Sequence, residues 1–112
     1  MKILVTGGTG FIGKRVVSQL LKNNINVVAS DINIKNEQES FEQFLNKKKI
    51  NKDNVKLIYL DISLRENIEK IITSNKITHI IACGYQMSNL IDINPVKGAE
   101  INIVGMTNLF QA

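Results

Sequence analysis

The chain has one cysteine, one proline and no tryptophan, and it has no long apolar run. A single cysteine, Cys83, excludes an internal disulfide and is consistent with a reducing compartment. The apolar runs are far shorter than the ~20 residues that a membrane-spanning helix needs. The first strand is expected to begin almost at Met1, which leaves no room for a signal peptide. We therefore expect a cytoplasmic protein without a membrane partner.

Aromatic residues are also scarce, at 5%, although the formal net charge is +4. A basic balance can indicate a nucleic-acid-binding protein, but here the aromatic residues are not interleaved with the basic run Lys47, Lys48, Lys49 and Lys52. We therefore predict that these lysines form the solvated end of a helix, where the helix dipole favours them, and that the protein binds no nucleic acid. At 112 residues, the chain is one domain or part of one.

The most informative stretch is the opening one, Met1 to Gly13, with the sequence MKILVTGGTGFIG. The apolar run Ile3-Leu4-Val5 predicts a strand buried on both faces, and the apolar residues of 14–22 recur at helical spacing. The glycines between them predict a tight turn at Gly7, close approach of a pyrophosphate at Gly10, and close helix packing at Gly13. Unpaired N–H groups at the helix start would then face the phosphates. This stretch predicts a dinucleotide cradle rather than an ordinary strand-to-helix turn.

An acid at the end of the next expected strand, residues 25–30, supports this interpretation. Asp31 follows Gly13 by 18 residues, close to the ~20 expected for a carboxylate that binds the adenine ribose. A carboxylate accepts hydrogen bonds from both ribose hydroxyls and repels a 2′-phosphate, and Ile32 follows it where NADP-binding proteins often have a basic residue. The sequence therefore favours NAD over NADP as cofactor. The basic residues Lys14 and Arg15 are the feature of the sequence that would instead favour NADP.

The remaining pattern alternates strand and helix. Strands are expected at 55–60 and 77–83, a polar loop at 33–40, a loop at 84–94, and helices at 39–49, after 63 and from 95 to the end. Ser63 and Glu66 have the spacing of a capping box, and Asn94 before Pro95 is typical of a helix start. We expect the last helix to run through Ala99, Ile103, Met106, Leu109 and Phe110 to the end of the chain.

These elements predict an α/β fold: a Rossmann-type parallel sheet with helices on both faces. We expect this sheet to be incomplete, with only its first four strands present. Ligands of such sheets bind beyond the carboxyl ends of the strands, where the strand order reverses, here between the first and fourth strands. Asp61 and the stretch Cys83-Gly84-Tyr85 fall at this edge. We expect Cys83 to be a small buried hydrophobe and Tyr85 part of the wall, whereas His79 lies at the opposite end. No metal site is predicted.

Thr6 to Gly13, in this setting, resembles the extended short-chain dehydrogenases/reductases, the NAD-dependent epimerase/dehydratase family. The resemblance covers the whole chain: Leu60-Asp61-Ile62 is similar to the family's adenine contact, IIACGYQ at 80–86 to its fourth-strand end, and 95–112 to its PxxxxxxNVxGTxNLLEA helix. Carried over by position, the cofactor-lining residues are Gly7, Gly10, Phe11, Ile12, Asp31, Asp61, Ile62, Cys83, Gly84 and Tyr85. Asn102 matches the asparagine that supports the family's active-site lysine through water. The departures are Ala82, Gly84 and Tyr85, where the family commonly has a histidine and two alanines.

The resemblance implies hydride transfer on a nucleotide sugar, with a tyrosine acid or base and a lysine four residues later. Neither tyrosine of this chain qualifies, because Tyr59 and Tyr85 are followed at that spacing by Ser63 and Asn89. We therefore expect 1–112 to be the cofactor-binding part of such an enzyme, inactive alone, with a homodimer possible for the full protein. The alternative is a stand-alone NAD(P)-binding or interaction module without catalysis. If nothing followed Ala112, the fourth strand would be an open apolar edge, and we expect that chain to aggregate or be marginally stable.

Overall fold

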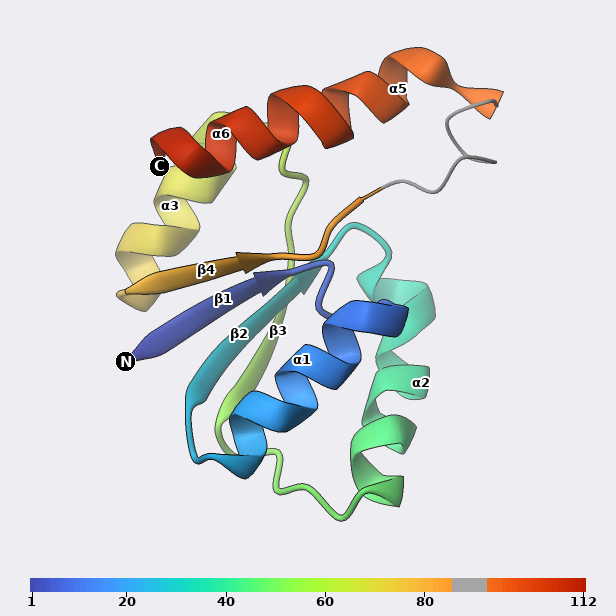
Figure 1. Cartoon of the computed structure of the whole chain (residues 1–112), viewed down its shortest axis with the longest axis vertical. Coiled ribbons are helices and arrows are strands. Elements are labelled where there is room, and N and C mark those ends of the chain that lie inside the picture. The colour runs from blue at the N-terminus through green and yellow to red at the C-terminus, as the bar shows by residue number, and fades with distance from the viewer. Residues whose placement is uncertain (86–92) are drawn as a thin grey trace.

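The computed structural model describes residues 1–85 and 93–112 and contains a four-stranded parallel sheet within them, with strand order β3-β2-β1-β4. Helices cover both faces of the sheet (Figure 1), so the predicted Rossmann-type α/β fold is confirmed. The strands are β1 (Lys2–Thr6), β2 (Asn26–Asp31), β3 (Val55–Tyr59) and β4 (His79–Ala82). The helices are α1 (Phe11–Lys22), α2 (Ile34–Lys47), α3 (Arg65–Asn75), α5 (Pro95–Ala99), the π-helix η1 (Glu100–Gly105) and α6 (Met106–Gln111).

The central strands are buried on both faces because their side chains alternate between two apolar layers. On one face, Ile3 and Val5 of β1 pack with residues of α1 and α2. On the other face, Leu4 and Val28 pack with residues of α3, η1 and α6. Figure 1 shows α1 and α2 on one side of the sheet, and α3 with the last helix on the other. Two cores thus fix the sheet, and its carboxyl edge carries the turns that follow each strand.

The strand order places the switch point at the predicted position. β1 lies between β2 and β4, so the chain leaves β1 toward β2 and returns to the other side of β1 for β4. In open parallel sheets this reversal leaves a crevice beyond the carboxyl ends of the strands, where ligands bind. The end of β1 and the end of β4 meet there, since Thr6 is in register with Ala82.

The polar loop predicted over 33–40 is wrong, because α2 already begins at Ile34. Four of the seven residues at 34–40 are Lys, Glu or Gln, which have good intrinsic helix propensity. Phe41 and Leu45 then anchor α2 to the core. α2 is therefore an integral layer of the fold. The end of the helix at Lys47, with further lysines after it, agrees with the predicted basic terminus.

The last helix differs from the predicted continuous α-helix. Asn94 caps α5 as predicted, since its Oδ1 accepts a hydrogen bond from the Lys97 N–H (3.1 Å), but the chain then forms the π-helix η1. Ile103 (64% exposed) and Phe110 (85% exposed) face outward. The buried residues of this helix are Gly98, Ile101, Gly105 and Leu109.

Among the helices of residues 1–85 and 93–112, none is long and apolar enough to cross a membrane. Most of the loop predicted over 84–94 lies outside the described residues.

Phe41 and Phe110, one buried and one exposed, provide a matched test of this packing. Phe41→Ala should lower the free energy of unfolding by about 3–5 kcal/mol, because it empties a core position that is only 1% exposed. Phe110→Ala should change it by no more than about 0.5 kcal/mol, because the ring already lies in solvent. Urea denaturation followed by circular dichroism measures both. A large loss for Phe110→Ala would contradict the outward orientation of that ring.

Candidate functional site

The turn after β1 brings three backbone segments together without side chains between them. Gly7 has φ +64°, and a Cβ there would lie 2.7 Å from the carbonyl carbon and oxygen of Cys83. A Cβ on Gly13 would collide with the Gly7 carbonyl oxygen. Both positions therefore require glycine, the first for its left-handed conformation and close approach, the second for helix packing. The β1 end, the α1 start and the β4 end are held in direct contact.

The start of α1 has the features of an anion-binding helix terminus. α1 begins at Phe11, earlier than the predicted Lys14, and its N-cap is Gly10, which has no side chain to cap it. The first turn contains no acidic residue. Of the atoms in the described part of the chain, only the Gly7 carbonyl oxygen would lie within 4 Å of a Cβ at Gly10, at 3.3 Å, so these residues leave the space beside this backbone open. Helix-start N–H groups and the positive end of the dipole favour an anion in this position.

A cavity of about 560 Å³ lies at this edge of the sheet, a volume typical of small-ligand sites. All ten cofactor-lining residues carried over from the family resemblance line it: Gly7, Gly10, Phe11, Ile12, Asp31, Asp61, Ile62, Cys83, Gly84 and Tyr85. Eight further residues line it that the sequence did not single out as lining: Thr6, Gly13, Ser30, Ile32, Asn33, Glu37, Leu60 and Ile101. Asn102 lies in η1 and is not among the described residues that line the cavity, so its predicted role stays a prediction.

Three of the eight missed lining residues belong to segments whose structure the sequence did not reveal, and the other five lie in or beside the predicted strands and glycine turn. Asn33 and Glu37 lie at the start of α2, where a loop is expected from the sequence. Ile101 lies on the buried face of η1, and no sequence pattern marks that helix in advance. The cavity wall thus includes residues from both helix layers.

Thr6 and Ser30 contribute two buried hydroxyls to the lining. They are register neighbours on β1 and β2, and each residue is 1% exposed. Neither Thr6 Oγ1 nor Ser30 Oγ has a hydrogen-bond partner in the described part of the structure. Most buried polar atoms are paired in packed cores, so unpaired hydroxyls are typical of a functional position.

Asp31 ends β2 and presents its carboxylate at the cavity. Its Oδ2 accepts a hydrogen bond from the Thr9 hydroxyl (2.7 Å), and its Oδ1 accepts one from the Asn33 N–H (3.3 Å). Among the described residues, no lysine or arginine forms an ion pair with this carboxylate. Asp31 therefore keeps acceptor capacity and negative charge for a ligand.

Asp61 is held differently. Its Oδ1 accepts hydrogen bonds from the Ser63 N–H (3.0 Å) and hydroxyl (2.6 Å), and its Oδ2 forms an ion pair with Lys97 Nζ (3.0 Å). Burial raises the pKa of Asp61, but the bonds from Ser63 and Lys97 outweigh it and hold that pKa below its usual value. The hydrogen bond to Asp61 in turn raises the pKa of Lys97.

This arrangement corrects the predicted capping box. α3 begins at Arg65, its N-cap is Leu64, and no side chain caps it. Ser63 instead turns back to Asp61, because a carboxylate two residues earlier is within reach of both its N–H and its hydroxyl. Lys97, which comes from α5, could not be linked to Asp61 from sequence, since the two are 36 residues apart.

Ile62 is positioned by the last helix. The Asn108 side-chain amide donates a hydrogen bond to the Ile62 carbonyl (3.0 Å), and a Cβ on Gly105 would lie 2.5 Å from Ile62 Cγ1. The missing side chain at Gly105 therefore makes room for Ile62, while Asn108 fixes its backbone. The segment after β3 is shaped by residues more than 40 positions later in the chain.

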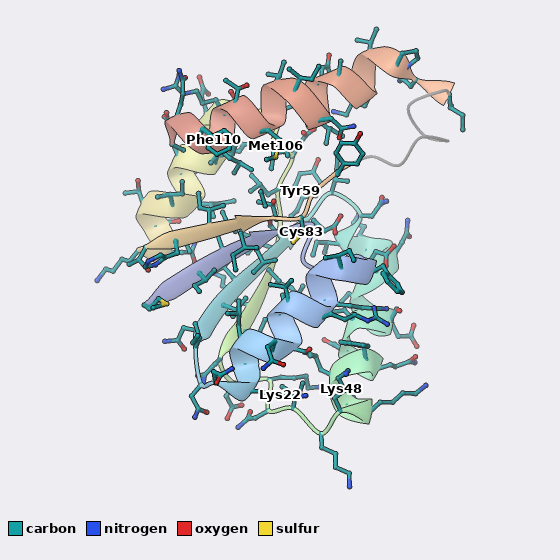
Figure 2. All side chains as sticks on the ribbon, viewed as in Figure 1. Lys22, Lys48, Tyr59, Cys83, Met106 and Phe110 are labelled. Carbon is teal, nitrogen blue, oxygen red and sulfur yellow. The ribbon has the colours of Figure 1, made fainter. Side chains whose placement is uncertain are left out.

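The end of β4 supplies the remaining wall. Figure 2 shows Cys83 at the carboxyl end of β4, where its N–H donates to the Thr6 carbonyl (3.0 Å). Burial raises the pKa of the Cys83 thiol, which keeps it protonated and unsuited to nucleophilic chemistry. Tyr85 is exposed at the cavity wall, and His79 begins β4 at the opposite edge, where its Nδ1 lies 2.8 Å from Thr78 Oγ1.

Comparisons with known proteins agree with this geometry. A family model for GDP-mannose 4,6 dehydratase matches residues 4–112. The bifunctional UDP-glucose 4-epimerase and UDP-xylose 4-epimerase 1 of Pisum sativum is 32% identical over 112 residues, which cover 98% of this chain and 32% of that protein. A UDP-glucose 4-epimerase of Neisseria meningitidis serogroup B is 40% identical over 105 residues, covering 93% of this chain and 30% of that protein.

Solved structures give the same picture. The UDP-glucose 4-epimerase of Thermus thermophilus in complex with NAD has a TM-score of 0.78 and 28% identity, covering 99% of this chain and 33% of that one. The enzyme of the same name from Thermotoga maritima, with UDP-glucose, has a TM-score of 0.79 and 28% identity over the same shares. The chain spans about a third of the length of these relatives.

The Asp61–Lys97 pair predicts a pH-dependent contribution to stability. Because the pKa of Asp61 is lowered on folding, its contribution is present above about pH 3.9, the unfolded value, and is lost as the pH falls through the folded pKa. The pKa of Lys97 is raised, so its contribution is present below about pH 10.4 and is lost as the pH rises through the folded value. Lys97→Met should therefore destabilise the protein most at neutral pH.

The measurement is urea denaturation of wild type and Lys97→Met between about pH 2.5 and about pH 8, a window that includes the Asp reference pKa. The difference in unfolding free energy should shrink as Asp61 becomes protonated. Arg65→Met is the matched control, because Arg65 pairs with Glu69 and donates a hydrogen bond to Gln111 Oε1 (2.8 Å), both exposed contacts of a kind that contributes little. A Lys97→Met effect that is constant across the pH range would refute the ion-pair contribution.

Proposed function

Because the chain belongs to the GDP-mannose 4,6 dehydratase family, we propose that it forms the NAD-binding part of an enzyme that acts on nucleotide sugars by hydride transfer. The observation that carries the proposal is the glycine turn: the uncapped start of α1 lines a cavity at the switch point of the sheet, with Asp31 on the same wall. The NAD complex of the Thermus thermophilus relative and the UDP-glucose complex of the Thermotoga maritima relative support the cofactor and the substrate class.

The residues present fit such a cofactor. The backbone around Gly10 and the start of α1 would hold the diphosphate, since that space is open and the helix terminus favours negative charge. Asp31 would accept the adenine ribose hydroxyls, and Asp61 and Ile62 would contact adenine. Cys83, Gly84 and Tyr85 would then line the nicotinamide side.

When bound, NAD supplies hydride transfer, and the residues of this chain supply its binding and orientation. No residue of the chain is assigned the proton transfer, because neither tyrosine has a lysine four residues later. Asn102 is proposed to support an active-site lysine contributed by a later part of the protein. A homodimer of the full protein, for which the outward-facing Ile103 and Phe110 offer apolar surface, is part of the same proposal.

The alternative is a stand-alone NAD(P)-binding or interaction module without catalysis. Both functions include NAD binding, so turnover discriminates between them. The full chain that the gene encodes should interconvert or dehydrate a nucleotide sugar in the presence of NAD. Binding of NAD without turnover of any nucleotide sugar would support the module.

Cofactor choice gives the direct test. Isothermal titration calorimetry should show tighter binding of NAD than of NADP. Asp31→Ala should weaken NAD binding by about tenfold or more, because hydrogen bonds to a charged group contribute about 1.5–3 kcal/mol, and should remove the preference. The matched control is Asp53→Ala, an exposed aspartate outside the cavity lining, which should leave both affinities unchanged. No binding of either dinucleotide by the wild type would overturn the proposed function, whereas an unchanged preference in Asp31→Ala would overturn only the role of Asp31.

A further inference from the structure

Thr9 lies inside the glycine turn, yet its side chain points to a different strand. It is 2% exposed, and its hydroxyl donates to Asp31 Oδ2 at 2.7 Å, a short bond of the kind formed with a charged acceptor. The bond joins the first turn to the end of β2, 22 residues later. Thr9 does not itself line the cavity in the described part of the structure, whereas Asp31 does.

The direction of this bond follows from the chemistry of its partners. An ionised carboxylate only accepts, so the Thr9 hydroxyl must donate. The threonine side chain is stiff at χ1 because it is β-branched, and burial leaves the hydroxyl little freedom. Thr9 therefore acts as a fixed donor toward one oxygen of Asp31.

The Asp31 carboxylate has more acceptor sites than its two hydrogen bonds occupy. A carboxylate has about four lone-pair sites, two on each oxygen. Thr9 occupies one on Oδ2, and the Asn33 N–H occupies one on Oδ1. Within the described residues 1–85 and 93–112, one site on each oxygen has no other donor, which matches two neighbouring hydroxyl donors, as in a ribose cis-diol. A 2′-phosphate offers acceptors and negative charge instead.

We propose that Thr9 is a positioning residue for the cofactor ribose: its hydroxyl holds the Asp31 carboxylate so that both oxygens receive the diol. This inference rests on the proposed NAD-binding function and adds a residue to it. Without the Thr9 hydroxyl, only the long Asn33 bond (3.3 Å) would orient the carboxylate, and the terminal torsion of an aspartate is broad. The carboxylate would then rotate away from the diol in part of the population.

The competing interpretation is a purely structural bond that ties the turn to β2. Such a bond would change the stability of the protein and would weaken NAD and NADP binding by the same factor, so it would leave the preference between the two unchanged. The change in preference therefore separates the two interpretations, and a double-mutant cycle with ligand binding tests in addition whether Thr9 acts through Asp31 or through another group.

The variants are Thr9→Val, which removes the hydroxyl at nearly constant shape, and Thr9→Ser, which keeps it. Calorimetry with NAD and NADP is carried out on the full chain that the gene encodes. Thr9→Val should weaken NAD binding roughly three- to tenfold, the loss of about one net hydrogen bond, and should narrow the preference for NAD over NADP. Thr9→Ser should stay within about twofold of wild type. In the Asp31→Ala background, Thr9→Val should change NAD binding by less than about twofold.

The outcomes are distinguishable. If wild type binds NAD in an Asp31-dependent manner and Thr9→Val leaves the affinity and preference unchanged, the inference is overturned while the proposed function stands. Equal weakening of NAD and NADP binding by Thr9→Val also overturns it, in favour of the structural bond. Equal weakening of NAD binding with and without Asp31 overturns it as well, because Thr9 would then act through another group. A wild type that binds no NAD overturns the proposed function and the inference together. If Thr9→Val does not fold, as judged by circular dichroism, Thr9→Ala replaces it in the same cycle.

Discussion

The whole site depends on a backbone contact that admits no side chain: the Gly7 carbonyl lies against the Cα of Gly13, and Gly7 itself lies against the Cys83 backbone. Any Cβ at Gly7 or Gly13 would overlap backbone atoms, which cannot move aside as a flexible side chain can. The contact fixes where α1 starts relative to β1 and β4. As a result the uncapped helix terminus opens onto the crevice and not onto bulk solvent.

The two carboxylates at the edge of the sheet differ in what balances their charge. Asp31 receives hydrogen bonds from a neutral hydroxyl and a backbone amide, so its negative charge remains available at the cavity. Asp61 is paired with the Lys97 ammonium, which neutralises it. A charged carboxylate accepts from both hydroxyls of a ribose diol and repels a 2′-phosphate, whereas an exocyclic amino group of a base needs only an oriented acceptor. The different partners of the two acids suit the two roles proposed for them.

The features of the fold that are predictable from the sequence are those fixed by interactions between neighbouring residues. The strands and the glycine turn were predictable, because a buried strand needs a short apolar run and a positive φ favours glycine, both of which are local. The start of α2 was missed because its polar first residues are equally compatible with a loop, and Phe41 and Leu45 decide the matter through tertiary contacts. Ser63 was assigned to a cap because the capping-box pattern takes no account of the nearer Asp61 carboxylate.

The cavity has two parts that differ in how far apart in the sequence their residues lie. The proposed phosphate end is built by residues of the continuous stretch 6–13, whose shape is encoded locally. The proposed base end is built by the segment after β3 together with Lys97, Ile101, Gly105 and Asn108 of the last helix. Asp61 and Ile62 are held by hydrogen bonds from residues 36 and 46 positions later, so this end forms only when the last helix packs against the sheet. Substitutions on this helix are therefore expected to act on the proposed adenine side through Asp61 and Ile62, while the glycine turn keeps its form.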